Sequence, residues 1–431
     1  MTTISPLAEI EHAVQSRAKD LALDPSLPDG AHLLSTLVSE EVQRWSLDYK
    51  RGRREFDLTD PDGVAERVNR NLTGYGPLQP LLDDDDVWEI MVNAPDTIFV
   101  KRHNGPSGYH HEVFHDDDHV RRTLTKIMDD ASSAHRTLDP TEGLQDAQLD
   151  NGSRLHIVHS DVAKDSHMIF NIRKFTGVAY RTLGELVEVG TLSAAVAGLL
   201  RAAVRSRASI LFAGSPGTGK TTLLSCCASE LDPSLRVVVA EEVFEADVPL
   251  PNVASMQTRP ARAERDAVDL RRLVSGFLRM APDVAIVGEV RDREALPLLL
   301  TLSSGVTGYT TIHAGSARQA LTRLRFICQL SDTSNELPMA ALNSLVSEAI
   351  DLVVHLERTP HGVEVSEVLA VEDLTTGLDG IHFTATTLFD RSSPENRVAW
   401  TGDHPIRLGR KLKNNGHNVT DLLGGLSEMT R

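Results

Sequence analysis

Apolar positions in the second half of the chain follow two periods, and these periods predict alternating helices and strands. After Thr191, apolar residues recur at helical spacing at Val196, Leu199, Leu200, Ala203 and Val204. Short apolar runs with the length of buried strands lie at 209–213, 235–240, 283–287 and 309–312. Because strands and helices alternate, we expect a mainly parallel sheet covered by helices.

The first part of the chain has a different pattern. Residues 8–70 are rich in Ala, Leu, Glu, Arg and Gln, and their apolar positions have helical spacing. The Gly- and Pro-rich stretch 74–82 interrupts this pattern. Short alternating runs at 89–93 and 97–101 then have the period of strands, so we expect a mixed α/β domain there.

At 431 residues, the chain is too long for one compact core. We predict a helical leader (1–70), an α/β N-terminal domain (71–175), a linker (176–190), a second α/β domain (191–372) and a C-terminal extension (373–431). Within the extension, 379–389 has the pattern of β structure and 407–415 is basic, but the sequence assigns this segment no role.

A glycine-rich loop follows the apolar run at 209–213 and precedes a helix-like segment at 222–228. It has the form GxxxxGK[ST], which in this strand, loop and helix context predicts phosphate binding. The expected nucleotide-binding residues are Gly214, Ser215, Pro216, Gly217, Thr218, Gly219, Lys220, Thr221 and Thr222. Glycines let consecutive backbone N–H groups face phosphate oxygens, and the helix adds the positive end of its dipole.

This loop predicts ATP and Mg²⁺ as cofactors. Lys220 is expected to reach the β- and γ-phosphates, and the Thr221 hydroxyl is expected to ligate Mg²⁺. The alternative is a glycine-rich turn that contains Lys and Thr by chance, and the flanking pattern disfavours it.

Carboxylates follow two of the predicted strands. Glu241, Glu242 and Glu245 come after the run at 236–240, and Glu289 comes after the run at 284–287. Open α/β sheets bind ligands at the carboxyl ends of their strands, so these groups are candidates for catalysis. Since no Asp precedes Glu289, this glutamate is expected to serve the Mg²⁺ shell, the attacking water, or both. For Glu241 and Glu242, a solvated loop is the alternative.

His313 ends the run at 309–312. A neutral imidazole at this position could hydrogen-bond the γ-phosphate or a water molecule. For a histidine considered alone, an ordinary structural role is the stronger interpretation.

Composition restricts the possible partners and the compartment. The formal net charge of -17 discourages broad nonspecific binding of nucleic acid, although it does not exclude a basic lining inside a ring. The three cysteines have no CxxC spacing, which suits a reducing cytosol. No stretch approaches the roughly 18 apolar residues of a membrane span. We therefore expect a cytoplasmic protein whose contact with a membrane runs through partners.

Five histidines could form a metal site, but a hydrophilic hairpin accounts for them without fixed ligand geometry. They are His103, His110, His111, His115 and His119.

Five motifs in order resemble those of the type II/IV secretion ATPases, and more closely the CpaF/TadA branch that powers tight-adherence pili. They are Gly214 to Thr221, Glu241 to Glu245, 257–260, 278–291 and 310–314. The likeness extends through 74–82, 89–93, 150–155 and 171–175, and so covers roughly 65–370. An ordered set of motifs is far more specific than one loop.

The resemblance implies a homo-hexameric ring with nucleotide held between an N-terminal domain and a RecA-like P-loop ATPase domain over 191–372. Hydrolysis would rotate one domain against the other and drive an inner-membrane platform. By this resemblance Glu241 to Glu245 match the Asp box, Glu289 the Walker B glutamate and His313 the second His-box histidine. The phosphate-contacting arginines would correspond to Arg136, Arg154 or Arg173.

Two positions depart from the family pattern. Glu242 stands where an aspartate is common, and its extra methylene could shift a water-positioning carboxylate and slow turnover. Val306 stands where the first His-box histidine is common, so a relay through that position is missing. These departures put turnover and coupling in doubt, while nucleotide binding is unaffected.

Three hypotheses follow. The leading one is an ATP-hydrolysing motor of pilus assembly or secretion, with nucleic acid an unlikely partner. The second is a nucleic-acid-translocating ATPase of a conjugation-type system. The third is an ATP-binding structural ring subunit with little turnover, which Val306 favours.

Overall fold

A computed structural model describes most of the chain. The described residues are 5–23, 28–103, 105–131, 137–149, 151–174, 180–259, 261, 266–331, 337–360, 362–377, 380–382, 384–391 and 397–424. The chain divides into two compact units, Met1–Thr176 and Gly177–Arg431. Among the residues just given, no helix combines the length and the apolar character that a bilayer span requires.

Three helices open the first unit: α1 (Pro6–Asp20), α2 (Pro28–Lys50) and α3 (Pro61–Thr73). The Ser5 hydroxyl accepts from Ala8 N and the Asp60 carboxylate from Gly63 N, and these contacts cap α1 and α3. The helices enclose a small core of Ile10, Val14, Leu34, Leu37, Val38, Val42, Trp45 and Val68. This arrangement matches the helical spacing of the sequence.

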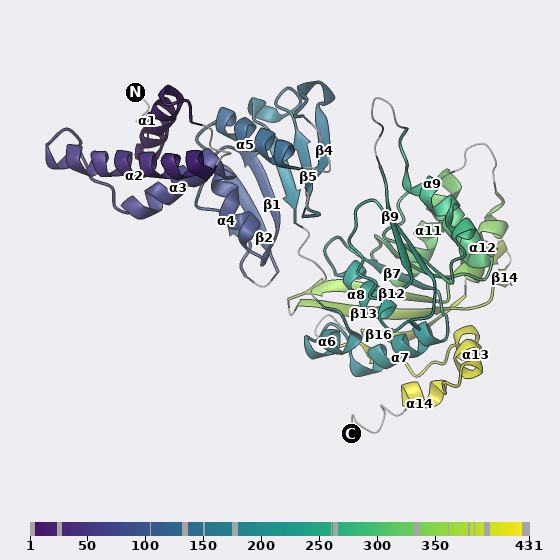
Figure 1. Cartoon of the computed structure of the whole chain (residues 1–431). Helices are drawn as coiled ribbons and strands as arrows, with labels where there is room; N and C mark the ends of the chain where they lie inside the picture. The colour runs from purple at the N-terminus through teal and green to yellow at the C-terminus, as the bar shows by residue number, and fades with distance from the viewer. Residues whose placement is uncertain are drawn as a thin grey trace. The chain divides into compact units, whose positions relative to one another are not determined.

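An antiparallel sheet and the short helices around it form the rest of the first unit (Figure 1). Within the described residues its strand order is β3-β2-β1-β6-β5-β4. Its elements, in chain order, are η1 (Gly76–Leu78), α4 (Gln79–Asp83), β1 (Val87–Ala94), β2 (Thr97–Arg102), β3 (Gly108–Tyr109), α5 (Asp117–Asp130), η2 (Pro140–Glu142), β4 (Leu144–Gln148), β5 (Arg154–Val158), η3 (Lys164–Ser166) and β6 (Ile169–Arg173). Ile90, Phe170 and Ile172 face a core that also contains Leu124 and Ile127 of α5. Glu89 of β1 and Arg173 of β6 lie at positions that alternate with these core residues and are more exposed.

The second unit is built on a larger sheet, whose strand order within the described residues is β17-β16-β13-β12-β7-β11-β10-β8-β9. The strands from β12 to β9 are parallel, whereas β13, β16 and β17 pair antiparallel. The strands are β7 (Ile210–Gly214), β8 (Val237–Glu241), β9 (Val253–Gln257), β10 (Val284–Val287), β11 (Thr307–Ile312), β12 (Leu352–Thr359), β13 (Gly362–Val371), β16 (Ala385–Asp390) and β17 (Ala399–Trp400). A separate pair consists of β14 (Thr375–Gly377) and β15 (Gly380–His382).

Helices cover both faces of this sheet (Figure 1). Residues of α6 (Leu183–Glu188), α7 (Ala194–Arg205), α8 (Lys220–Ala228), α13 (Arg407–Asn414) and α14 (Val419–Gly424) pack in one core. Residues of α9 (Leu270–Ser275), α10 (Ala295–Ser303), α11 (Ala317–Ser331) and α12 (Met339–Ala349), beside η4 (Phe277–Met280), pack in the other. Strands β7, β8, β10 and β11 are buried along their whole length, which explains their continuous apolar runs.

The predicted linker differs from the structure. Residues 175–179 lie outside the described residues, but α6 falls inside the predicted range 176–190. Its Leu183 and Leu186 are buried in the core of the second unit. The range therefore contains packed structure as well as a connection, because two buried leucines fix its helix to the sheet.

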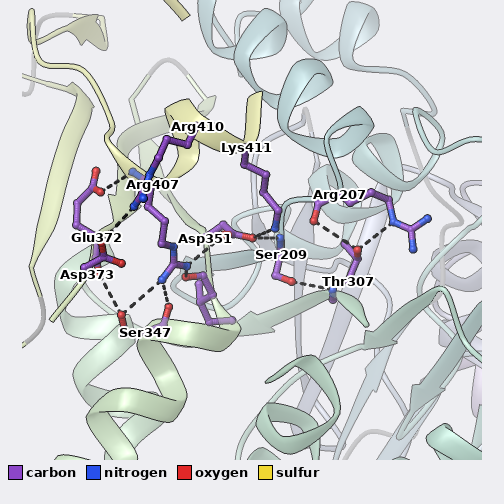
Figure 2. Close-up of polar contacts among 12 residues, drawn as sticks. Arg207, Ser209, Thr307, Ser347, Asp351, Glu372, Asp373, Arg407, Arg410 and Lys411 are labelled. Carbon is purple, nitrogen blue, oxygen red and sulfur yellow. Dashed lines mark hydrogen bonds and ion pairs between the residues drawn. The ribbon is translucent and has the colours of Figure 1, made fainter. Parts of the chain in front are cut away.

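The C-terminal extension is part of the second unit. Strand β16 pairs with β13, and Leu408 and Leu412 of the basic helix α13 are buried in the core. Figure 2 shows how charged groups attach this helix to the sheet. Arg407 and Lys411 both donate to the carboxylate of Asp351, at 3.1 and 2.6 Å.

The same network reaches the start of β7. Asp351 also accepts from the backbone N–H of Ser209, at 2.8 Å, and the Ser209 hydroxyl accepts from Gly308 N of β11, at 3.0 Å. Glu372 accepts from the backbone N–H groups of Ile406 and Arg407, at 2.9 and 2.8 Å. We call Asp351, Glu372, Arg407 and Lys411 the C-terminal clamp.

Candidate functional site

The glycine-rich loop has a backbone shape that its glycines make possible. Gly214 has φ 149°, and a Cβ there would lie 2.4 Å from Leu356 O and 2.6 Å from Thr218 Oγ1. Gly217 and Gly219 have φ 73° and 72°, in the left-handed region that glycine adopts at no steric cost. No side chain caps the start of α8, so its first N–H groups are available to an anion.

Lys220 begins α8 and is almost completely buried, with 6% of its surface exposed. Its Nζ donates to Ser215 O at 2.9 Å and lies 3.2 Å from Nδ1 of His313. Thr221 and Thr222 follow in the first turn of the helix and are half-buried. The loop therefore places the lysine, both threonines and the first N–H groups of α8 at the carboxyl end of β7.

A continuous chain of polar contacts runs from Lys220 along this edge of the sheet. His313 Nε2 lies 2.8 Å from Glu289 Oε1, and Arg291 donates to Glu289 Oε2 at 2.6 Å. The other terminal nitrogen of Arg291 donates to Glu242 Oε2 at 3.1 Å. Strand order explains the alignment, because β7, β11, β10 and β8 are neighbours, and each of the four supplies a group at its carboxyl end.

The contacts of His313 place it between a cation and an anion. Its Nδ1 lies 3.2 Å from Lys220 Nζ, which can only donate, and 3.2 Å from Gly214 O, which can only accept, while its Nε2 lies 2.8 Å from Glu289 Oε1. The imidazole therefore connects Lys220 on one side with Glu289 on the other.

Glu289 is ionised at neutral pH. Burial alone would raise the pKa of this carboxyl, but the contacts with His313 and Arg291 outweigh burial and lower the pKa to about 2. The hydrogen bond to Glu289 correspondingly raises the pKa of Arg291. A permanently charged carboxylate near the phosphate loop suits a metal-binding or water-orienting role.

The predicted acidic cluster after β8 divides into groups with different contacts. Glu242 joins the contact chain, whereas Glu241 is only 2% exposed and accepts from Glu245 N and Ala246 N, at 3.1 and 2.9 Å. Glu241 also packs so closely that a Cβ on Gly288 would lie 2.9 Å from its Cγ. Glu241 therefore shapes the loop that carries Glu242 and Glu245.

Arg154 and Arg173 are directly opposite each other on β5 and β6, and Glu89 of β1 is the next partner of Arg173. Like charges in directly opposite positions weaken a sheet. Their contact with phosphates remains a prediction, and Arg136 lies outside the described residues.

Sequence analysis assigned no role to two arginines at this edge. Arg291 follows Glu289 by two residues within one motif, and only the position of β8 beside β10 places it against Glu242. Arg358 of β12 donates to Gly217 O at 2.9 Å, across 141 positions of sequence. Nothing in the local pattern around Arg358 could have predicted this contact with the loop.

The donor types at this edge fit magnesium bound together with a nucleotide. Mg²⁺ takes one or two protein oxygens and completes its shell with phosphates and water, and Thr221 and Glu289 supply a hydroxyl and a carboxylate. The described residues contain no group of three or more His, Cys, Asp or Glu side chains that could hold a metal by themselves.

Two of the five histidines considered as a metal site have protein contacts in the structure. His115 Nε2 lies 2.8 Å from the buried Glu11 carboxylate, and His119 packs against the Phe114 ring. Burial lowers the pKa of His119 to about 4, so this ring is neutral. Val306, at the position of the missing histidine, packs against the apolar core.

Comparison with known proteins decides the family. The family model described as type II/IV secretion system protein matches residues 71–372. The chain belongs to this family. It is 32% identical over 303 residues to a putative conjugal transfer protein of Mycobacterium tuberculosis (strain ATCC 25618 / H37Rv), covering 68% of this chain and 83% of that protein. It is 31% identical over 304 residues to the type IV secretion system protein PtlH of Bordetella pertussis (strain Tohama I), covering 65% and 88%.

A solved structure supports the fold. The ATPase DotB of Yersinia pseudotuberculosis aligns with TM-score 0.50 at 16% identity, covering 69% of this family member and 79% of DotB. The RecA-like fold predicted from the sequence is confirmed. The relatives named above carry conjugal transfer and type IV secretion names, so the family is shown and its tight-adherence branch remains a prediction.

Proposed function

We propose that this chain is an ATP-hydrolysing motor subunit of a secretion or pilus-assembly machine. Family membership supports the class, and one observation carries the mechanism. Lys220 of the phosphate loop is connected through His313 to an ionised Glu289 at the same edge of the sheet. In this arrangement, only the His313 side chain separates the cation that would bind phosphate from the anion that would orient water.

In the proposed mechanism the loop from Gly214 to Thr222 binds the phosphates through its N–H groups and Lys220. Glu289 orients the attacking water and, with Thr221, holds the metal, while Glu242 and Glu245 extend the acidic surface beside it. When bound, Mg²⁺ would neutralise the phosphate charge that develops during cleavage. His313 senses the γ-phosphate, because a negative charge at Lys220 competes directly for the cation that now faces Nδ1.

The rest of the proposal concerns the assembly. By family likeness the chain forms a homo-hexamer in the cytoplasm, docked to the membrane through inner-membrane platform proteins. Arg154 and Arg173 of the first unit would then stabilise phosphate charge, a task for which a planar guanidinium is well suited. The CpaF/TadA tight-adherence branch is the assignment we propose within the family.

Two substitutions test the function. Lys220→Ala should remove ATP binding, whereas Glu289→Gln should keep binding and lower turnover at least about a hundredfold, as expected for loss of a group that acts in the transition state. Phosphate release and the dissociation constant for ATP measure the two effects. Full turnover in Glu289→Gln would contradict the mechanism. Absence of turnover in the wild type at every protein concentration would instead favour the structural ring subunit that Val306 suggests.

A second function is favoured by the names of the relatives. The relative from Mycobacterium tuberculosis is called a putative conjugal transfer protein, which suits an ATPase that moves nucleic acid. Adding single-stranded DNA to the hydrolysis assay at physiological salt separates the two functions. Unchanged turnover supports the secretion motor, and many-fold stimulation supports translocation of nucleic acid.

A further inference from the structure

The Arg291 guanidinium occupies the middle of the contact chain, between two carboxylates. Its Nη2 donates to Glu289 Oε2 at 2.6 Å, and its Nη1 donates to Glu242 Oε2 at 3.1 Å. A guanidinium presents its donors in a rigid planar fork, so the two carboxylates are held at a fixed separation. A lysine ammonium in the same place would be a point charge without this geometry.

The two carboxylates belong to different strands. Glu289 follows β10 and Glu242 follows β8, and these strands pair in parallel. Arg291 therefore joins the loop after β8 to the end of β10. Because Arg291 holds Oε2 of Glu289, the other oxygen is left without a hydrogen-bond partner among the described residues, 2.8 Å from Nε2 of His313.

Stability alone does not explain these contacts. The side chains of Arg291 and Glu242 are 47% and 48% exposed. The pair between these two side chains contributes little to folding, typically below about 1 kcal/mol. The arrangement is therefore better suited to orienting Glu289 than to holding the fold together.

We propose that Arg291 is a positioning residue, which orients the Glu289 carboxylate toward His313 and ties Glu242 to the same point. This inference rests on the proposed function and deepens it. Arg291 acts through Glu289 and has no contact with Lys220. Its removal should leave phosphate binding in place while the water-orienting oxygen loses its fixed direction.

Kinetics of Arg291→Ala, Arg291→Lys and the matched control Arg293→Ala test this role. Arg293 is an exposed arginine two residues further along the chain. We expect Arg291→Ala to lower kcat about thirtyfold, because misplacing a catalytic group by about 1 Å can cost up to a hundredfold. The dissociation constant for ATP should stay within about threefold, since the loop is intact. Arg293→Ala should match the wild type.

Rescue separates positioning from packing. Arg291→Lys should recover only part of kcat, since it restores charge without the fork. Free guanidinium at millimolar concentration should raise the kcat of Arg291→Ala several-fold and leave Arg293→Ala unchanged. The half-exposed site lets the small cation enter.

A measurement without nucleotide completes the test. Hydrogen exchange of the amides in 242–247 should be faster in Arg291→Ala than in Arg293→Ala, because the loop after β8 loses its tie to β10. The thermal midpoint should change by less than about 4 °C, because the pair with Glu242 is half exposed and only Glu289, at 20% exposure, loses a more buried contact.

Three results would overturn the positioning role. They are an unchanged kcat in Arg291→Ala, a joint loss of ATP binding and thermal stability, or equal exchange of 242–247 in the two alanine variants. The exchange result is independent of turnover. If the wild type hydrolyses no ATP, the proposed function fails, while the exchange comparison still decides whether Arg291 holds the loop.

Discussion

The larger sheet has a charged network at each end of its strands, and the two networks differ in burial. At the carboxyl end, Arg291 and Glu242 meet with about half of each side chain exposed. At the amino end of β7 and β12, the Asp351 side chain is only 10% exposed and binds Arg407 and Lys411 of the C-terminal clamp (Figure 2). The Arg291–Glu242 pair can break at small cost, whereas Asp351 is a carboxylate that cannot lose its partners cheaply.

This difference suits the proposed function. In that mechanism, groups that meet phosphate change partners during a reaction cycle, and half-exposed ion pairs allow this. A buried network instead fixes the strands in place. The Asp351 carboxylate accepts from Ser209 N immediately before β7, the strand whose other end carries the phosphate loop. The buried network therefore fixes the amino end of β7, while the side chains at the carboxyl end of the sheet can change partners.

The largest expected effect comes from breaking the clamp. Asp351→Ala should lower the free energy of unfolding by about 3 kcal/mol, because Arg407 and Lys411 would be left beside a partly buried site without their anion. Urea denaturation measures the loss. Asp373→Ala is the control, since the Asp373 side chain is 72% exposed in its pair with Arg410 and should cost at most about 0.5 kcal/mol. Equal losses in both variants would remove the distinction between buried and exposed networks.

Acid should weaken the carboxyl-end network. The pKa of Glu289 is about 2 in the folded chain, against an ordinary value of 4.5, so its contribution to stability is present above pH 4.5 and is lost as the pH falls toward 2. We expect the difference in unfolding free energy between wild type and Glu289→Gln, on the order of 2 kcal/mol at neutral pH, to shrink between pH 5 and pH 3. Urea titrations across this range measure it. A difference that stays constant with pH would contradict the ionised carboxylate.

Arg358 connects β12 to the phosphate loop and provides a smaller effect. Arg358→Ala removes a hydrogen bond to Gly217 O and should weaken ATP binding about threefold to tenfold, consistent with about 1 kcal/mol for such a bond. The neighbouring Glu357→Ala should leave affinity unchanged. Fluorescence titration with a labelled nucleotide distinguishes the two. Equal affinities would show that the loop keeps its shape without Arg358.

The smallest effect is expected at Glu242. Glu242→Asp shortens the side chain by one methylene and should lengthen its contact with Arg291, which lies at 3.1 Å. Because both partners are about half exposed, turnover should change by no more than about threefold. Steady-state hydrolysis measures this. A tenfold change in either direction would mean that Glu242 has a more direct part in the reaction than its place at the end of the contact chain indicates.

Much of the fold follows from local sequence. Buried strands β7, β8, β10 and β11 appear as apolar runs because both of their faces are covered. The phosphate loop is predictable because its glycines and its lysine are consecutive in sequence.

The order of strands is not local, and it decides the site. Because β11 lies between β7 and β10, His313 falls between Lys220 and Glu289. Glu241 and Glu242 look alike as a sequence pair, yet one is buried beneath the loop and the other is exposed. The contact between Asp351 and Arg407 spans 56 positions and has no local signal.

Strand β16 extends the sheet beyond the limit of the family match at residue 372. In a fragment trimmed to that limit, the N–H and C=O groups on the outer edge of β13 would be unpaired and could bind a strand of another chain. Such a fragment would self-associate edge to edge. Oligomers of this fragment would then result from the exposed edge of β13. They would not show whether the full-length chain forms a ring.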